Sequence, residues 1–210
     1  MQIKEILSFS PLIPVVVIDD ADAAVPLANA LIAGGIRVIE VTLRTATALA
    51  AIRRIAAEVP DAVVGAGTIL RPQQFAEIED AGAAFAVSPG ATPELLAGAR
   101  DSRIPFLPGA ATASEAMRLL ESGYKQMKFF PAESAGGAGL LGSLVSPLPD
   151  AKFCPTGGID PANAESYLRL PNVACVGSSW PVPAAAIRSG EWERITERAR
   201  TCAGLRRQAN

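Results

Sequence analysis

One lysine and one carboxylate are the residues of this sequence best placed to do chemistry together. Lys128 lies in a short apolar segment, residues 126–129, and Glu40 lies in another, residues 38–43. Side chains alternate along a strand, so both residues should point away from their apolar neighbours and into the interior of a sheet covered by helices. A lysine placed there loses hydration, which favours the neutral amine that attacks a carbonyl carbon. The pattern predicts Lys128 as a nucleophile, or as an alternative a structural Lys128–Glu40 ion pair.

The other lysines are weaker candidates for this role. Lys4 precedes the first predicted strand, while Lys125 and Lys152 lie where two later strands begin. In a barrel of parallel strands the beginnings of the strands serve stability and the ends carry function. Lys128 is therefore the preferred nucleophile.

The absence of histidine excludes several kinds of chemistry. Among the 210 residues none is a histidine, so no imidazole can activate a serine or cysteine or hold a zinc ion. Proton transfer must fall to carboxylates, lysine, tyrosine or water. No metal or other cofactor is predicted.

Alternating short strands and helices must position these side chains. Eight predicted strands cover residues 13–18, 38–43, 62–66, 84–87, 104–107, 126–129, 152–154 and 173–176. Helices are predicted at 23–33, 47–58, 72–80, 93–99, 114–121 and 161–168, and a final amphipathic helix at 191–210. Successive strand-end motifs are roughly 20 to 30 residues apart, enough for one strand, one helix and two short turns. We therefore predict an α/β fold, a (β/α)8 TIM barrel, with residues 1–210 as a single domain.

An open doubly wound sheet is the alternative arrangement. Such a sheet normally carries a glycine-rich turn after its first strand to bind a dinucleotide. Residues 18–22 contain no glycine and three aspartates. This turn favours the barrel.

Glycines and small hydroxyl residues follow the last two predicted strands. They form the segments Thr156-Gly157-Gly158 and Gly177-Ser178-Ser179. In a barrel, the backbone N–H groups of these two loops commonly bind phosphate. Either segment alone would be explained by a tight turn, but their occurrence on neighbouring strands predicts a phosphorylated substrate.

Composition limits the partners and the compartment. The 19 basic and 21 acidic side chains nearly balance, which argues against a nucleic-acid partner. The apolar run at residues 12–18 is too short to cross a membrane and contains Pro14. Cys154, Cys175 and Cys202 are scattered and odd in number, as expected for reduced thiols. We expect a cytoplasmic protein without membrane contact.

Long ordered motifs resemble a known family, the 2-keto-3-deoxy-6-phosphogluconate (KDPG) and 4-hydroxy-2-oxoglutarate (KHG) aldolases, which are class I enzymes on a (β/α)8 barrel. The resemblance covers nearly the whole chain. It is carried by Gly34-Gly35-Ile36-Arg37-Val38-Ile39-Glu40-Val41-Thr42-Leu43-Arg44-Thr45, Val64-Gly65-Ala66-Gly67-Thr68, Val87-Ser88-Pro89-Gly90, Lys128-Phe129-Phe130-Pro131-Ala132-Glu133 and Cys154-Pro155-Thr156-Gly157-Gly158-Ile159.

The resemblance implies a reaction and a role for each matching residue. The reaction would be cleavage of KDPG to pyruvate and glyceraldehyde 3-phosphate, and also of 4-hydroxy-2-oxoglutarate to pyruvate and glyoxylate, through a lysine Schiff base. The implied roles are Lys128 as the Schiff-base lysine, Glu40 as the general acid/base, Arg44 and Thr68 as ligands of the pyruvyl carboxylate, Pro89 and Phe130 as walls of the pyruvate pocket, and Thr156, Gly157, Gly158, Gly177 and Ser179 at the phosphate end. A homotrimer is also implied.

One position departs from the family pattern. Ser178 stands where family members have glycine in a Gly-Gly-Ser-Trp motif. Its side chain would either restrict the approach of a phosphate to the backbone or add a hydroxyl donor. We include Ser178 among the predicted substrate-binding residues.

Three other functions remain open on the residues alone. The chain could be a related pyruvate-dependent aldolase, such as one for 2-keto-3-deoxy-6-phosphogalactonate, because no residue reads the configuration at C4. It could be a phosphosugar epimerase or isomerase, although such enzymes commonly use a metal that carboxylates alone would have to hold here. The third is a non-catalytic barrel that binds a phosphorylated metabolite.

Overall fold

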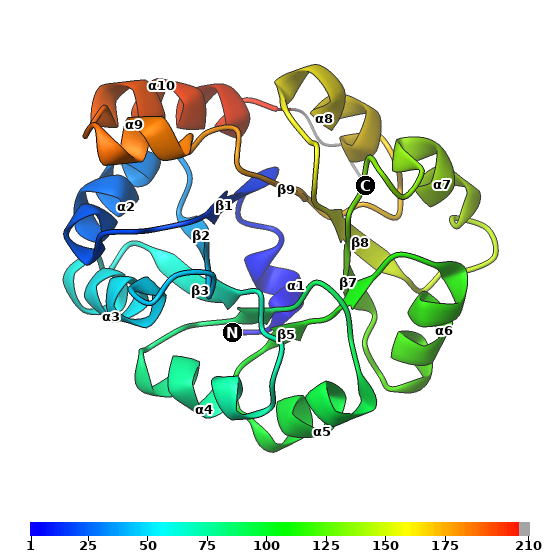
Figure 1. Cartoon of the computed structure of the whole chain (residues 1–210). Coiled ribbons are helices and arrows are strands. Elements are labelled where there is room, and N and C mark those ends of the chain that lie inside the picture. The colour runs from blue at the N-terminus through cyan, green and yellow to red at the C-terminus, as the bar shows by residue number, and fades with distance from the viewer. Residues whose placement is uncertain (206–210) are drawn as a thin grey trace.

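Parallel strands surrounded by helices make up the described part of the chain, residues 1–205 of the computed structural model (Figure 1). The strands are β1 (Leu12–Val16), β2 (Val38–Thr42), β3 (Val63–Gly67), β4 (Ala86–Val87), β5 (Phe106–Leu107), β6 (Gly109–Ala110), β7 (Gln126–Phe129), β8 (Lys152–Pro155) and β9 (Val176–Ser178). Each of the eight predicted strands overlaps an observed one. The predicted α/β class is confirmed. Residues 206–210 of the predicted 1–210 domain lie outside the described residues.

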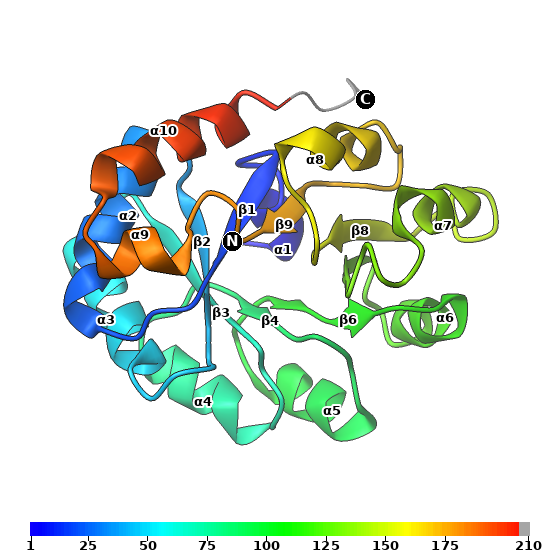
Figure 2. The same cartoon turned by 45° about the horizontal axis from the view of Figure 1, so that its top comes forward.

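The helices alternate with these strands and lie around them (Figures 1 and 2). They are α1 (Ile3–Ile6), the 3-10 turn η1 (Ala21–Ala23), α2 (Ala24–Ala33), α3 (Ala48–Glu58), α4 (Gln73–Asp80), α5 (Pro93–Asp101), α6 (Ala113–Glu121), α7 (Gly137–Ser143), α8 (Pro161–Leu168), α9 (Ala184–Arg188) and α10 (Trp192–Ala203). The sequence did not predict α1, α7 or α9. All three are short, and α7 is rich in glycine, so they carry little helical periodicity.

The strands pair in two parallel sheets, in the orders β5-β4-β3-β2-β1-β9 and β6-β7-β8. Pro108 separates β5 from β6, and proline has no N–H to donate to a neighbouring strand. Between β8 and β9 the pairing is reduced to isolated bridges, one of which joins Thr156 to Gly177. The structure therefore shows a curled parallel sheet, while the continuous eight-stranded barrel predicted from the sequence is interrupted at these two junctions.

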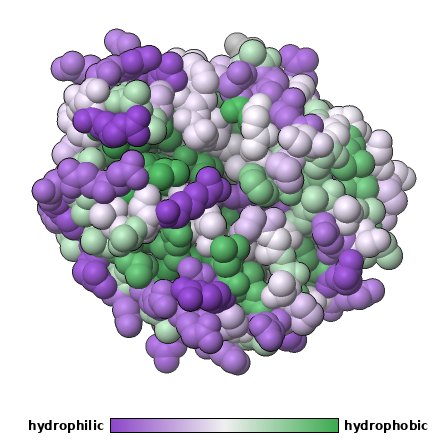
Figure 3. Space-filling model, viewed as in Figure 1, coloured by the Kyte–Doolittle hydropathy of each residue, from purple (hydrophilic) through white to green (hydrophobic). Residues whose placement is uncertain are grey.

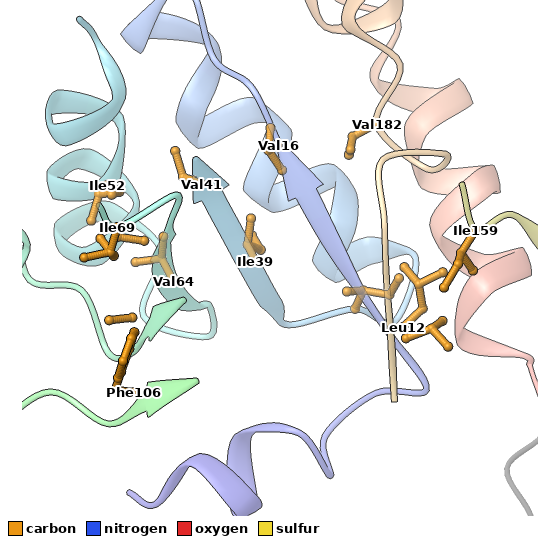
Figure 4. Close-up of a cluster of buried hydrophobic side chains, with 14 of the residues drawn as sticks. Leu12, Val16, Ile39, Val41, Ile52, Val64, Ile69, Phe106, Ile159 and Val182 are labelled. Atoms are coloured by element: carbon orange, nitrogen blue, oxygen red, sulfur yellow. The ribbon is translucent and has the colours of Figure 1, made fainter. Parts of the chain in front are cut away.

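Alternate residues of each strand contribute to two separate apolar layers. One face packs under the helices and includes Leu12, Val16, Ile39, Val41 and Val64 (Figure 4). The other face forms a smaller inner cluster. The inner cluster consists of Ile6, Leu7, Ile13, Val38, Val63, Phe85, Val87, Leu107, Cys154 and Cys175. Helix α1 supplies Ile6 to this cluster, so the inside of the curled sheet is filled by side chains at that level.

Side-chain caps set where several helices begin. Thr92 accepts a hydrogen bond from the Leu95 N–H at the start of α5, and Thr112 accepts one from the Glu115 N–H at the start of α6. Asp160 caps α8 by accepting hydrogen bonds from the N–H groups of Ala162 and Asn163. These contacts satisfy N–H groups that have no partner within the helix.

A buried tyrosine ties α8 to the segment that follows β7. The Tyr167 side chain is fully buried, and its hydroxyl donates a hydrogen bond to the Glu133 carboxylate. Burial, together with this carboxylate, raises the pKa of the Tyr167 phenol. The neutral phenol is therefore the form that the folded protein favours.

We predict that Tyr167→Phe lowers the free energy of unfolding by about 1–2 kcal/mol near neutral pH, because it removes this hydrogen bond. A raised folded-state pKa stabilises the fold below the unfolded pKa of about 10, and this stabilisation is lost as the pH rises further. The difference between wild type and variant should thus shrink above about pH 10. Urea unfolding at pH 7 and pH 11 measures both differences, and equal values would contradict the prediction.

Candidate active site

A buried lysine–carboxylate pair joins two strands across the inside of the sheet. The Lys128 Nζ of β7 lies 3.1 Å from the Glu40 Oε1 of β2, and both side chains are 5% exposed. The two residues are 88 positions apart in the chain. Strand alternation puts Glu40 two residues beyond Val38 of the inner cluster, so the pair lies above that cluster, toward the carboxyl ends of the strands. The proximity expected from the sequence is confirmed.

A glycine provides the space that Glu40 occupies. A Cβ at Gly67, the last residue of β3, would lie 2.2 Å from the Glu40 Oε1. Such a contact is far inside van der Waals distance, so no larger residue fits without moving the carboxylate. Gly67 therefore determines where Glu40 can lie.

A second cation follows the strand that carries Glu40. The Arg44 Nε, just beyond β2, donates a hydrogen bond of 3.2 Å to the Thr68 Oγ1. Thr68 has a φ of 62°, a left-handed conformation that is rare for a β-branched residue and is often found at functional sites. The guanidinium retains further donors with which it can bind a carboxylate as a fork.

Lys128 and Arg44 line a cleft with a volume of about 590 Å³. The residues lining it are Val15, Val17, Arg44, Lys128, Phe130, Thr156, Gly157, Gly158, Ile159, Asp160, Ser178, Ser179, Trp180, Val182, Pro183 and Ala184. The ring of Phe130 has its centroid 5.4 Å from the Lys128 Nζ. In the face seen in Figure 3, several apolar patches lie around the middle, with hydrophilic side chains both among them and along the rim.

Four predicted site residues lie outside this lining. Glu40 pairs with Lys128, which lines the cleft, and Thr68 accepts a hydrogen bond from Arg44, which also lines it. Gly177 is packed behind Thr156, since a Cβ there would lie 2.3 Å from the Thr156 Oγ1. Pro89 follows β4 and packs against Gly109. Its predicted contact with pyruvate stays a prediction.

One charged residue of the cleft was not predicted from the sequence. Asp160 follows the glycines of the β8 loop and begins α8, and its carboxylate caps that helix. An aspartate directly before a proline and a helical segment is a recognisable N-cap signal. That signal would have placed Asp160 at the mouth of the cleft. The apolar wall at Val182, Pro183 and Ala184 was missed as well.

Ser178 connects the two loops that follow β8 and β9. Its hydroxyl donates a hydrogen bond to the Ile159 carbonyl and accepts one of 3.0 Å from the Trp180 N–H. The side chain is buried, so this hydroxyl is committed to the protein. Ser178 therefore acts as a link between loops in this structure.

Metal ligands are not grouped in the described residues. Nowhere within residues 1–205 do three or more Cys, Asp or Glu side chains come together in a way that could hold a metal ion. Over the same range, the helices are too short or too polar to span a membrane.

Comparison with known proteins identifies the family. The model of the KDPG and KHG aldolase family matches residues 3–198. The chain belongs to this family. The prediction made from the sequence motifs is thereby confirmed.

Several relatives are close over nearly their whole length. A KHG/KDPG aldolase of Escherichia coli is 53% identical over 197 residues, which cover 94% of this chain and 92% of that protein. A KDPG aldolase structure from Legionella pneumophila, with pyruvate captured as a covalent carbinolamine intermediate, has a TM-score of 0.95 and 49% identity, covering 97% of this chain and 99% of that one. A KDPG aldolase structure from Zymomonas mobilis with 3-phosphoglycerate has a TM-score of 0.92 and 44% identity, covering 99% and 97%.

We predict that Gly67→Ala destabilises the protein by about 1–3 kcal/mol, because the added methyl group collides with the Glu40 carboxylate. Gly139→Ala is the matched control, since a Cβ there meets nothing within 4 Å. In the helix α7 it should stabilise the protein by up to about 1 kcal/mol. Equilibrium urea unfolding measures both changes, and equal stability of the two variants would contradict the prediction.

Proposed function

We propose that this protein is a class I aldolase that cleaves KDPG to pyruvate and glyceraldehyde 3-phosphate through a Schiff base on Lys128. The observation that carries the proposal is the buried Lys128 Nζ, 3.1 Å from the Glu40 carboxylate, at the cleft that also contains Arg44. The covalent pyruvate adduct of the Legionella pneumophila relative supports the same chemistry. The reaction needs no metal, because the iminium ion takes up the electron pair released when the carbon–carbon bond breaks.

The first half of the reaction builds the iminium ion. Transfer of a proton from Lys128 to Glu40 leaves a neutral amine, which attacks the C2 ketone to form a carbinolamine. Glu40 then returns a proton to the carbinolamine hydroxyl, directly or through water, and water leaves. A carboxylate within hydrogen-bond distance of the amine is correctly placed for both transfers.

The second half breaks and remakes bonds at C3. A base takes the proton of the C4 hydroxyl, the C3–C4 bond breaks, and glyceraldehyde 3-phosphate leaves. The electron pair passes into the iminium ion and gives an enamine, which is protonated at C3. Hydrolysis then releases pyruvate and restores the Lys128 amine.

The two ends of the substrate have different neighbours in this proposal. Arg44, held by Thr68, binds the carboxylate of the pyruvyl group, and Phe130 and Pro89 enclose that group. The distal end, which receives the phosphate-bearing part, is formed by Thr156, Gly157, Gly158, Ser178 and Ser179, with Gly177 packed behind Thr156. Cleavage of 4-hydroxy-2-oxoglutarate is a second proposed activity, supported by the dual name of the Escherichia coli relative.

The comparisons favour an aldolase over the epimerase and the non-catalytic barrel that the residues alone left open. We propose KDPG rather than 2-keto-3-deoxy-6-phosphogalactonate as the substrate, because several similar relatives are named 2-dehydro-3-deoxy-phosphogluconate aldolases.

We further propose that the strands close into a (β/α)8 barrel and that residues 1–210 are one domain. The bridge between Thr156 and Gly177 supports closure on one side, and the hydrogen bond from the Lys128 N–H to the Pro108 carbonyl supports it on the other. A homotrimer and a cytoplasmic location complete the proposal. Family membership supports the trimer, and three cysteines buried as thiols support the location.

We predict that Lys128→Met abolishes aldol cleavage, because no covalent intermediate can form, while Glu40→Gln lowers kcat by about 10² to 10⁴. Lys125→Met is the matched control. Its ammonium is exposed and forms a surface ion pair with Asp150, so kcat should change less than about twofold. A coupled assay for pyruvate measures all three variants, and substantial activity of Lys128→Met would exclude the proposed nucleophile.

We also predict that borohydride in the presence of pyruvate reduces a Schiff base on Lys128 irreversibly. Peptide mass analysis should place the added mass on the peptide that contains Lys128, and the Lys128→Met variant should show none. An adduct on Lys125 or Lys152 instead would refute the assignment.

A further inference from the structure

We propose that Asp160 and Ser178, at the distal end of the cleft, weaken the preference of the protein for a phosphorylated over an unphosphorylated substrate. The protein would then also cleave unphosphorylated 4-hydroxy-2-keto acids, in which the distal part carries only hydroxyl groups. The inference rests on the proposed aldolase activity. It concerns the opposite end of the substrate from Lys128.

The charges of the cleft are distributed unevenly. Among the described residues that line it, the cations are Arg44 and Lys128, which are bonded to Thr68 and Glu40 at the pyruvyl end. The distal end contributes a carboxylate, Asp160. A phosphate dianion placed there would be repelled by this carboxylate, and the described lining residues offer no cation at that end to offset the repulsion.

Two arginines on α9 and α10 interact with protein groups outside the distal end of the cleft or with its Trp180 wall. Arg198 stacks on the Trp180 ring at 4.5 Å and donates a hydrogen bond to the Trp180 carbonyl. Arg188, at the end of α9, pairs with Asp19 at 3.9 Å. Neither side chain belongs to the lining of the cleft.

Several backbone N–H groups beside the distal end have partners within the protein. The Ser178 hydroxyl accepts the hydrogen bond of the Trp180 N–H, so this donor is withdrawn from a ligand. Asp160 occupies the N–H groups of Ala162 and Asn163, and the Asn163 Oδ1 accepts the Asp160 N–H. The N-terminus of α8, which would otherwise attract an anion, is thereby satisfied and neutralised by its own cap.

The remaining surface at this end suits a neutral, hydroxylated group. Val182, Pro183 and Ala184 form an apolar wall, and the half-exposed ring of Trp180 lies beside it. The exposed residue Ser179 keeps a hydroxyl that can donate and accept hydrogen bonds. Such a mixture binds a polyol chain without requiring a charge.

The test compares two substrates in each of three proteins. We would measure kcat/KM for KDPG and for its unphosphorylated counterpart, 2-keto-3-deoxygluconate, with wild type, Asp160→Asn and Ser178→Gly. The ratio of the two values is the readout, because a fraction of unfolded protein lowers both values equally. Asparagine retains the ability to cap α8, and glycine at position 178 releases the Trp180 N–H.

The wild-type ratio should lie within about tenfold of unity, and each substitution should raise it by roughly three- to tenfold in favour of the phosphorylated substrate. Asp101→Asn, at the end of α5 and outside the cleft lining, is the control and should leave the ratio unchanged. A ratio that stays unchanged or falls in both distal variants would overturn the proposal. Borohydride trapping with pyruvate separates this outcome from failure of the aldolase assignment, because the adduct on Lys128 does not involve the distal end.

Discussion

The structure depends on keeping an ammonium and a carboxylate together inside a curled sheet. Lys128 and Glu40 are almost fully removed from water, and taking either charge out of water alone would cost several kcal/mol. Each therefore requires the other. Because one lies on β7 and the other on β2, the pair also requires the sheet to curl until distant strands face each other.

The surrounding residues are constrained by this pair. The inner apolar cluster fills the space below it, with Ile6 from α1 among its members. Gly67 leaves room for the carboxylate on one side. The pair is thus supported from below, and Lys128 lines the cleft from which the proposed keto acid would approach the amine. Burial and access are both satisfied because the pair lies at the carboxyl ends of the strands.

The cleft has two chemically different ends. Arg44 and Lys128 make the proposed pyruvyl end cationic, whereas the described residues that line the distal end include the Asp160 carboxylate and the apolar Val182–Ala184 wall but no cation. The first end fits a carboxylate and a ketone, which every substrate of the proposed reaction shares. The second end receives the part in which substrates differ. Reaction and selectivity are therefore set by separate groups of residues on separate loops.

The local elements and the family could be predicted from the amino-acid sequence alone. Alternation in residues 38–43 and 126–129 placed Glu40 and Lys128 on inward faces, and long motifs identified the aldolase family. Local patterns did not reveal α1 or α7, because short or glycine-rich helices depend on tertiary packing for their stability. They also did not reveal that Ser178 bonds to Ile159 and Trp180, or that Asp160 borders the cleft. Those contacts join loops that follow different strands. They therefore depend on how the folded chain brings the strand ends together, which local patterns do not contain.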